Sequence, residues 1–335
     1  MADPSVSLGL WEACWRDLVL GIVQGLTEFL PISSTAHLKV VPELLGWVDP
    51  GVSVTAAIQL ASILAVIAYF RRDLAQVLGG ISRAFRHGQW REPDARLGIA
   101  MAVGTVPILA VGLAIKLFWD EGYETSPLRS IPSIAVVSIV MALLLAVAER
   151  IGPRLKQLPG VSGRDGLVVG LAQVLALIPG VSRSGSTLTA SLLDGWQRAD
   201  AARFSFLLGI PAITIAGIVE LKDALAATAD AGPLPLLVGI LAATVVSWLA
   251  IDWLLKFLQS HSTWLFVVQL TSDQSGQRHH GTGQQGWHQP HSPGGEADPL
   301  RRPRAAKPAP QVGAAPEVYS DRALPSRWEA GAQSN

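Results

Sequence analysis

Two polar runs interrupt long apolar stretches of this chain, and they constrain its fold more than any other feature. The first, residues 24–37, reads QGLTEFLPISSTAH and contains a carboxylate, two serines and a histidine. The second, residues 179–187, reads PGVSRSGST. An ionisable side chain at membrane depth costs at least ~2.5–3.5 kcal/mol, so such groups usually face a wet cavity and have a function. The two runs are therefore the candidate site.

Composition predicts a polytopic membrane protein. Half of the 335 residues are apolar and 16% are charged, against roughly 25% charged residues in ordinary soluble domains. Residues 97–118, 131–147 and 234–255 are nearly free of charge and approach the ~20 residues that a helix needs to cross a bilayer. A net charge of zero argues against a nucleic-acid partner, and the single Cys14 excludes an internal disulfide.

The expected fold class is all-α: a polytopic membrane helix bundle with two re-entrant helix hairpins in an inverted repeat. Four apolar segments are too short to span, and they form two pairs, broken at Pro31 and at Pro179-Gly180, because proline and glycine disrupt a helix. Irregular backbone at membrane depth requires surrounding protein or water. The expected helical segments are 18–30, 34–45, 54–70, 97–118, 131–148, 166–178, 186–193, 204–221 and 234–255.

The two hairpins resemble each other in sequence. The motif GIVQ at residues 21–24 followed by LPISS at 30–34 matches GLAQ at 170–173 followed by IPGVS at 178–182. Broken apolar segments in corresponding positions of two halves indicate a midplane site built by internal repeats, although so short a match also arises by chance. Basic loops after Phe70 and near Ile151 are expected on the cytoplasmic side, and the acidic loop at 119–130 outside. The hairpins then enter from opposite faces, as an inverted repeat requires.

The expected domain organisation has three parts. Residues 1–17 form an N-terminal interfacial segment, residues 18–268 the membrane domain, and residues 269–335 a disordered hydrophilic tail rich in Gly, Pro, Gln and Arg. The first part lacks the features of a cleavable signal peptide, so the first apolar segment is expected to remain. The motif WLFVV at 264–268 looks like the opening of another spanning helix that the next residues cannot continue. A frame-shifted ending is one hypothesis for this tail.

The polar residue types favour phosphate chemistry. Gln24 and Glu28 are four residues apart and share a helix face, while Ser34 precedes His37 by three residues near the start of the return helix, where backbone N–H groups favour an anion. A serine near a histidine and a glutamate is typical of an activated nucleophile. Arg183 has the planar guanidinium suited to bidentate phosphate binding.

The hydroxyl groups around Arg183 extend this anion site. They belong to Ser182, Ser184, Ser186 and Thr187, with Gly185 between them. Simple packing is the alternative for each residue taken singly: membrane serines often make only interhelical hydrogen bonds, Glu28 can be a structural partner of Arg183, and His37 can cap a helix. Clustering at two matched breaks favours attack on a phosphorus atom. Gln59 and Glu220 also lie in apolar surroundings, but their spacing indicates no specific role.

Both polar runs resemble the signatures of the undecaprenyl-diphosphate phosphatase family, the bacitracin-resistance proteins. The segments AIQLASILAV at 57–66 and RFSFLLGIP at 203–211 are also similar to that family, so the resemblance covers about residues 18–268. It implies an inner-membrane, multi-pass enzyme that hydrolyses the diphosphate of a C55 isoprenoid carrier to the monophosphate for cell-wall synthesis. It further implies a divalent cation, Mg²⁺ or Ca²⁺, and a polyprenyl diphosphate substrate in the bilayer, and it leaves a homodimer open.

The resemblance also implies roles for individual residues. Ser34 is the expected nucleophile, His37 and Glu28 the acid/base groups, and Arg183 the diphosphate clamp; Glu28 is also the tentative metal ligand. The expected substrate-binding residues are Gln24, Ser33, Ser182, Ser184 and Thr187. The chain departs from the family at Gln24, where many members have Glu and where an amide is a poorer ligand for a hard cation, and after Val268, where the final apolar helix is missing.

Two other functions stay open at this stage. Inverted repeats with broken midplane helices are also the architecture of transporters, so a lipid flippase without hydrolase activity is the main alternative. The unusual C-terminal sequence raises a second one, an inactive member of the family. Release of inorganic phosphate from a C55 diphosphate, with and without a chelator, separates the phosphatase from the flippase.

Overall fold

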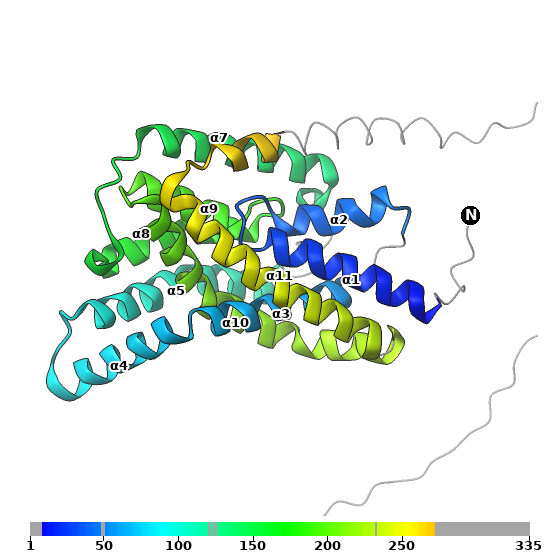
Figure 1. The fold of residues 1–335 in the computed structure, drawn as a ribbon, viewed down its shortest axis with the longest axis horizontal. Helices are drawn as coiled ribbons and strands as arrows, with labels where there is room; N and C mark the ends of the chain where they lie inside the picture. Colours follow the sequence, from blue (N-terminus) through cyan, green and yellow to red (C-terminus); the bar gives the residue numbers. More distant parts are fainter. Residues whose placement is uncertain (1–8, 48–50, 120–121, 123–125, 232, 272–335) are drawn as a thin grey trace, which may run out of the picture. The chain divides into compact units, whose positions relative to one another are not determined.

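The described chain is almost entirely helical, which confirms the predicted all-α fold. The computed structural model describes residues 9–47, 51–119, 122, 126–231 and 233–271. These residues form no β-strand beyond one isolated bridge between Lys156 and Trp196. In chain order the elements are α1 (Leu10–Thr27), α2 (Ser34–Leu44), α3 (Gly51–Tyr69), α4 (Arg71–His87), α5 (Pro93–Phe118), η1 (Pro127–Arg129), α7 (Ile131–Ile151), η2 (Leu158–Gly160), α8 (Gly163–Val174), η3 (Leu175–Leu177), α9 (Arg183–Leu193), α10 (Arg198–Ala231) and α11 (Pro233–Ser260) (Figure 1).

Four of the described helices are long and apolar enough to cross a membrane. They are α5, α7, the first part of α10 (Arg198–Ile218) and α11, and a shorter apolar segment, Ala57–Tyr69, lies in α3. Three of the four contain a predicted apolar segment in full, and Arg198–Ile218 overlaps the predicted segment 204–221. The chain is a membrane protein.

The two predicted helix breaks are present. Residues 28–33 separate α1 from α2, and residues 178–182 separate η3 from α9. Pro31 lies in the first break, and Gly180, with φ of +93°, allows the sharp turn in the second. All four helices of these pairs are short, from 11 residues in α2 and α9 to 18 in α1. The re-entrant path of each pair through the membrane stays a prediction.

Each broken pair packs against a helix from the other half of the chain. Helix α1 lies along α11, and α8 lies along α5, while α3 and α10 pack on each other between them (Figure 1). Both side contacts depend on glycine: a Cβ at Gly21 would lie 2.3 Å from the Gly239 carbonyl oxygen, and one at Gly170 would lie 2.2 Å from that of Gly104. This reciprocal pairing is the arrangement expected of two repeats, and it supports the predicted repeat.

Two predictions about the elements were wrong in detail. The basic stretch after Phe70 was expected to be a loop, but it forms α4, which ends at Gly88 with φ of +69°. One side of α4 packs on α5, and Val77 and Ala84 are buried. The first helix was expected to begin at residue 18, but α1 begins at Leu10. Of the predicted tail, residues 269–335, residues 269–271 are helical and the rest lie outside the described residues.

Candidate active site

The first break brings Glu28 and Ser34 together. Glu28 caps the C-terminus of α1, and its backbone N–H donates to the Gln24 carbonyl at 3.0 Å. The chain turns through Pro31 and re-enters a helix at Ser34, whose hydroxyl donates to Glu28 Oε2 at 2.8 Å. Phe29, which follows Glu28 in the chain, is 1% exposed and packs edge-to-face on Phe206 of α10, with 5.4 Å between the ring centroids. This aromatic contact fixes the tip that carries the carboxylate.

The second break brings Arg183 to the same carboxylate. Ser182 caps the N-terminus of α9 by accepting from the Gly185 N–H at 3.1 Å, so Arg183 is the first residue of that helix. Arg183 Nη2 donates to Glu28 Oε1 at 3.1 Å. Ser184 Oγ donates to the Leu30 carbonyl at 3.0 Å and ties the two tips together. The two polar runs, distant in sequence, therefore form one site.

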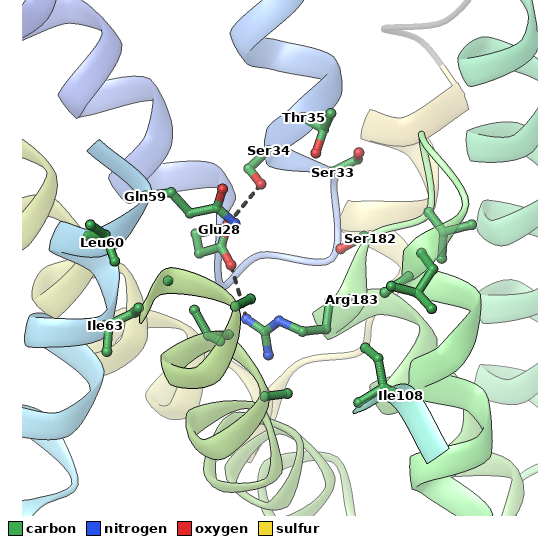
Figure 2. A pocket seen from close by; sticks show the side chains of 17 residues that line it. Glu28, Ser33, Ser34, Thr35, Gln59, Leu60, Ile63, Ile108, Ser182 and Arg183 are labelled. Atoms are coloured by element: carbon green, nitrogen blue, oxygen red, sulfur yellow. Dashed lines mark hydrogen bonds and ion pairs between the residues drawn. The ribbon is translucent and has the colours of Figure 1, made fainter. Parts of the chain in front are cut away.

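A cavity of about 260 Å³ lies between the two tips (Figure 2). Its polar wall includes Glu28, Ser33, Ser34, Ser182 and Arg183. Its apolar wall comes mainly from α3 and α10, with Leu60, Ile63 and Ile213 among the lining residues. The N-termini of α2 and α9 are both at the tips, where free backbone N–H groups favour negative charge. An anionic group attached to an apolar chain suits such a cavity.

Ser33 has an unusual backbone conformation beside this cavity. Its φ is +67°, in the left-handed region that non-glycine residues seldom adopt. The Ser33 side chain is buried, and within the part of the chain that the structure describes its hydroxyl has no hydrogen-bond partner. The Ser33 carbonyl accepts from His37 Nδ1 at 2.8 Å. Strain and an unsatisfied hydroxyl are typical of functional positions.

His37 and Gln24 lie behind the cavity wall rather than on it. Neither is among the described residues that line the cavity. Gln24 is fully buried, and its Nε2 donates to Glu28 Oε2 at 3.0 Å. The structure thus gives the Ser34 hydroxyl a direct bond to Glu28, and it places His37 next to Ser33 through the bond described above. The assignment of catalytic roles between Glu28 and His37 stays a prediction.

Two of the expected substrate-binding hydroxyls take structural positions. Ser184 and Thr187 are absent from the described cavity lining, whereas Ser182 is part of it. Thr187 Oγ1 donates to the Arg183 carbonyl at 2.9 Å and contacts the hydroxyl of Ser205 on α10. These bonds hold the first turn of α9, so Ser184 and Thr187 support Arg183 in this structure.

The sequence analysis assigned no functional role to two polar residues of α3. Gln59 lines the cavity, and Figure 2 shows its side chain directed toward Glu28 and Ser34. Ser62, fully buried, accepts from Gln24 Nε2 at 3.4 Å. The signal was present in the sequence: two polar residues three apart in an apolar segment share one helix face.

A half-buried lysine joins the two ends of the second helix pair, α8–α9. Lys156 Nζ donates to Asp165 Oδ1 at the start of α8 and to Asp194 Oδ2 at the end of α9, both at 2.6 Å. Burial alone would raise the pKa of the Asp165 carboxyl, but hydrogen bonds from Lys156 and Ser162 outweigh it and lower that pKa to about 2. This Lys156 clasp joins the two ends of the segment that presents Arg183.

Comparison with known proteins identifies the family. Residues 17–271 match the family described as bacitracin resistance protein BacA. The chain belongs to this family. A relative from Parasynechococcus marenigrum (strain WH8102), named undecaprenyl-diphosphatase, is 93% identical over 268 residues, which cover 80% of this chain and 93% of the relative.

Further relatives carry the same name. One from Synechococcus sp. (strain CC9605) is 82% identical over 268 residues, covering 80% of this chain and 93% of its own length. Another from Prochlorococcus marinus (strain MIT 9313) is 78% identical over 259 residues, covering 77% and 86%. These matches confirm the predicted family and an enzyme of the phosphatase class.

Proposed function

We propose that this protein hydrolyses undecaprenyl diphosphate to undecaprenyl phosphate and inorganic phosphate. The observation that supports this most directly is the Ser34 hydroxyl bonded to Glu28 at 2.8 Å, in a cavity that also contains Arg183. The names of the relatives point to the same substrate. The apolar wall of the cavity suits the isoprenoid, and the polar wall suits the diphosphate.

The residues divide the chemistry as follows. Arg183 and the N-terminus of α9 bind the oxygens of the diphosphate, while Ser182 and Gln59 offer further hydrogen bonds. Ser34 Oγ attacks the terminal phosphorus, and its proton passes to Glu28. The bond from that phosphorus to the bridging oxygen breaks, and undecaprenyl phosphate leaves with the electron pair. Water then attacks the phosphorylated Ser34 and releases inorganic phosphate.

The proton transfers fall to two groups. Glu28 is the better-placed base for Ser34, because its Oε2 already accepts that hydroxyl's hydrogen bond. His37 donates from Nδ1 to the Ser33 carbonyl, which leaves Nε2 as the basic nitrogen of its neutral ring. We assign His37 the role of second acid/base during hydrolysis of the phosphoserine.

The donor set is compatible with a divalent cation that also binds substrate oxygens. Glu28 supplies a carboxylate, and Gln24 Oε1 is a buried oxygen without a hydrogen-bond partner in the described part of the chain. Mg²⁺ sites commonly combine one or two carboxylates with substrate phosphates. Glu28 and the diphosphate oxygens would hold the ion, which would neutralise charge on the phosphoryl group.

The proposal places the enzyme in the bacterial cytoplasmic membrane, with the first hairpin entering from the outer face. Turnover there would return the lipid carrier for cell-wall synthesis. It would also confer bacitracin resistance. Nothing in the contacts described above requires a second copy of the chain, although a homodimer is compatible with them.

Phosphate release by the purified protein in detergent tests this proposal. Undecaprenyl diphosphate is supplied with Mg²⁺, with Ca²⁺ or with a chelator, and Ser34→Ala is measured beside the parent. We expect metal-dependent release by the parent and none by the variant. Thr244→Val on α11, at a residue that is not among the described residues of the cavity lining, is the matched control. A parent that binds the lipid but releases no phosphate would favour the flippase alternative.

A further inference from the structure

A chain of hydrogen bonds runs from Glu28 into the interior of the bundle. Gln24 Nε2 donates to Glu28 Oε2 at 3.0 Å and to Ser62 Oγ at 3.4 Å. Ser247 of α11 donates its hydroxyl to the same Ser62 oxygen at 3.1 Å. Gln24, Ser62 and Ser247 are all 0% exposed. These hydrogen bonds therefore connect three helices, α1, α3 and α11, through side chains that do not reach the surface.

The direction of each bond follows from the chemistry of the groups. An ionised carboxylate only accepts hydrogen bonds, so Gln24 must present its amide nitrogen to Glu28. That nitrogen has a second hydrogen, and Ser62 Oγ is its acceptor. Ser247 donates to Ser62 and occupies the other lone pair of that oxygen. Ser62 Oγ thus accepts from both the Gln24 amide and Ser247.

The alternative amide orientation shows what this arrangement prevents. Rotation of the Gln24 side-chain amide by half a turn would place Oε1 against Glu28 Oε2, acceptor against acceptor. It would also turn an oxygen toward Ser62 in place of the donor. Since Gln24 is neutral and Glu28 is the proposed base, only the observed orientation supplies the carboxylate with a donor on its buried side.

We infer that Ser62 and Ser247 are positioning residues of the phosphatase, which orient Gln24 so that its amide nitrogen holds the Glu28 carboxylate toward Ser34. This inference rests on the proposed function. It assigns a role in turnover to α3 and α11, which lie behind the cavity at this point. Neither serine touches the substrate, so both act through Gln24.

A simpler role must be separated from this one. Buried serines between membrane helices often only stabilise packing, and Gly25 of α1 approaches α11 so closely that a Cβ there would lie 2.9 Å from the Ser247 nitrogen. If the serines only stabilise packing, replacing either one should lower the stability of the protein whatever residue occupies position 24. A positioning role requires Gln24 and disappears without it.

The test is a double-mutant cycle. Ser62→Ala, Ser247→Ala, Gln24→Ala and the pairs Ser62→Ala/Gln24→Ala and Ser247→Ala/Gln24→Ala are purified in detergent, and kcat and KM are measured with undecaprenyl diphosphate. For Ser62→Ala we expect kcat to fall about 3- to 10-fold, the worth of one neutral hydrogen bond, with KM unchanged. For Ser247→Ala we expect a smaller fall in kcat. Each serine substitution should have no further effect on kcat in the Gln24→Ala background, because residues that act as one unit are not additive.

Thr244→Val is the matched control at the same α11–α3 interface. Thr244 Oγ1 donates to the Ala61 carbonyl at 3.4 Å and to the Ile240 carbonyl at 2.8 Å, and it has no bond to Gln24 or Glu28 among the described contacts. We expect its kcat to equal that of the parent. Melting temperatures in detergent are measured for every variant, so a folding defect is distinguished from a loss of turnover.

The outcomes separate this inference from the proposed function. A parent that releases no phosphate overturns the proposed function and the inference with it. With an active parent, the inference alone fails if Ser62→Ala keeps full kcat. It also fails if Ser62→Ala loses the same factor in the presence and absence of Gln24, or if Thr244→Val loses as much.

Discussion

Arg183 uses only part of its guanidinium within the protein. Nη2 bonds Glu28, whereas Nη1 is buried and has no hydrogen-bond partner in the part of the chain that the structure describes. A buried unsatisfied donor at a cavity wall is costly unless a ligand completes it. Under the proposed function, the second nitrogen would bond an oxygen of the diphosphate while the first holds the carboxylate.

Replacing Arg183 with lysine should accordingly be severe. Lysine keeps the charge but cannot bond Glu28 and the substrate with two coplanar arms. We expect kcat/KM for Arg183→Lys to fall about 30- to 150-fold, equivalent to roughly 2–3 kcal/mol of transition-state stabilisation. Steady-state phosphate release measures it, and near-full activity in this variant would remove Arg183 from the site.

The two adjacent serines should respond differently to substitution. Ser34→Ala removes the proposed nucleophile, so turnover should vanish while substrate binding largely survives. Ser33→Ala keeps the nucleophile and should only slow the reaction. Phosphate release and lipid binding are measured on both variants. Robust metal-dependent turnover by Ser34→Ala would favour direct attack by water.

Sequence reasoning located the site residues because each is a polar residue next to a helix break. Ser34, Glu28 and Arg183 stand out as polar groups beside helix breaks, and the structure brings them together. Whether the side chains of Ser184 and Thr187 face the cavity could not be predicted from the sequence. Both hydroxyls find acceptors on nearby backbone, and which side of α9 faces the cavity is decided by its packing against α7 and α10.

At the scale of the elements, the Lys156 clasp joins the two ends of the segment that carries Arg183. Because the pKa of Asp165 is lowered to about 2 from the usual 3.8, the folded state binds this proton less readily than the unfolded state. The carboxylate therefore contributes its full stabilisation above about pH 4 and loses it as the pH falls through 2.

The Lys156→Met variant tests the clasp. Without the cation the pKa of Asp165 should rise, so the acid-induced fall in melting temperature should begin at higher pH than in the parent. Melting in detergent between pH 2 and 7 measures this. Lys256→Met is the control, because its exposed i,i+4 pair with Asp252 is expected to contribute little. Superimposable curves for Lys156→Met and the parent would contradict the role of the clasp.

The helix breaks were predictable and α4 was not. Proline and glycine weaken a helix, and where they adjoin a polar run inside an apolar segment, as Pro31 and Gly180 do, they mark a turn in the sequence alone. In α4, the arginines were interpreted as the charges of a loop. Leu74, Val77, Ile81 and Ala84 recur at helical spacing within that stretch, and this periodicity of three to four residues was the overlooked signal.

At the scale of the whole molecule, the predicted topology places both ends of each hairpin on one side of the membrane. Single cysteines in a Cys14→Ser background test this with a membrane-impermeant thiol reagent. Glu12→Cys and Glu43→Cys at the first pair should react in intact cells. Gln157→Cys and Gln197→Cys at the second should react only after permeabilisation. Opposite sides for the two ends of one pair would mean that it spans the bilayer.

The reciprocal packing of α1 on α11 and of α8 on α5 has a consequence for synthesis. At ~5–20 residues per second, α11 emerges on the order of ten seconds or more after α1. Until then the glycine face of α1 lacks its partner, and Glu28 lacks the support that reaches it from Ser247. The second hairpin has its partner from the start, because α5 is synthesised before α8. In the nascent protein, the hairpin that carries Arg183 can therefore pack first. The hairpin that carries Glu28 can pack only after α11 has been inserted.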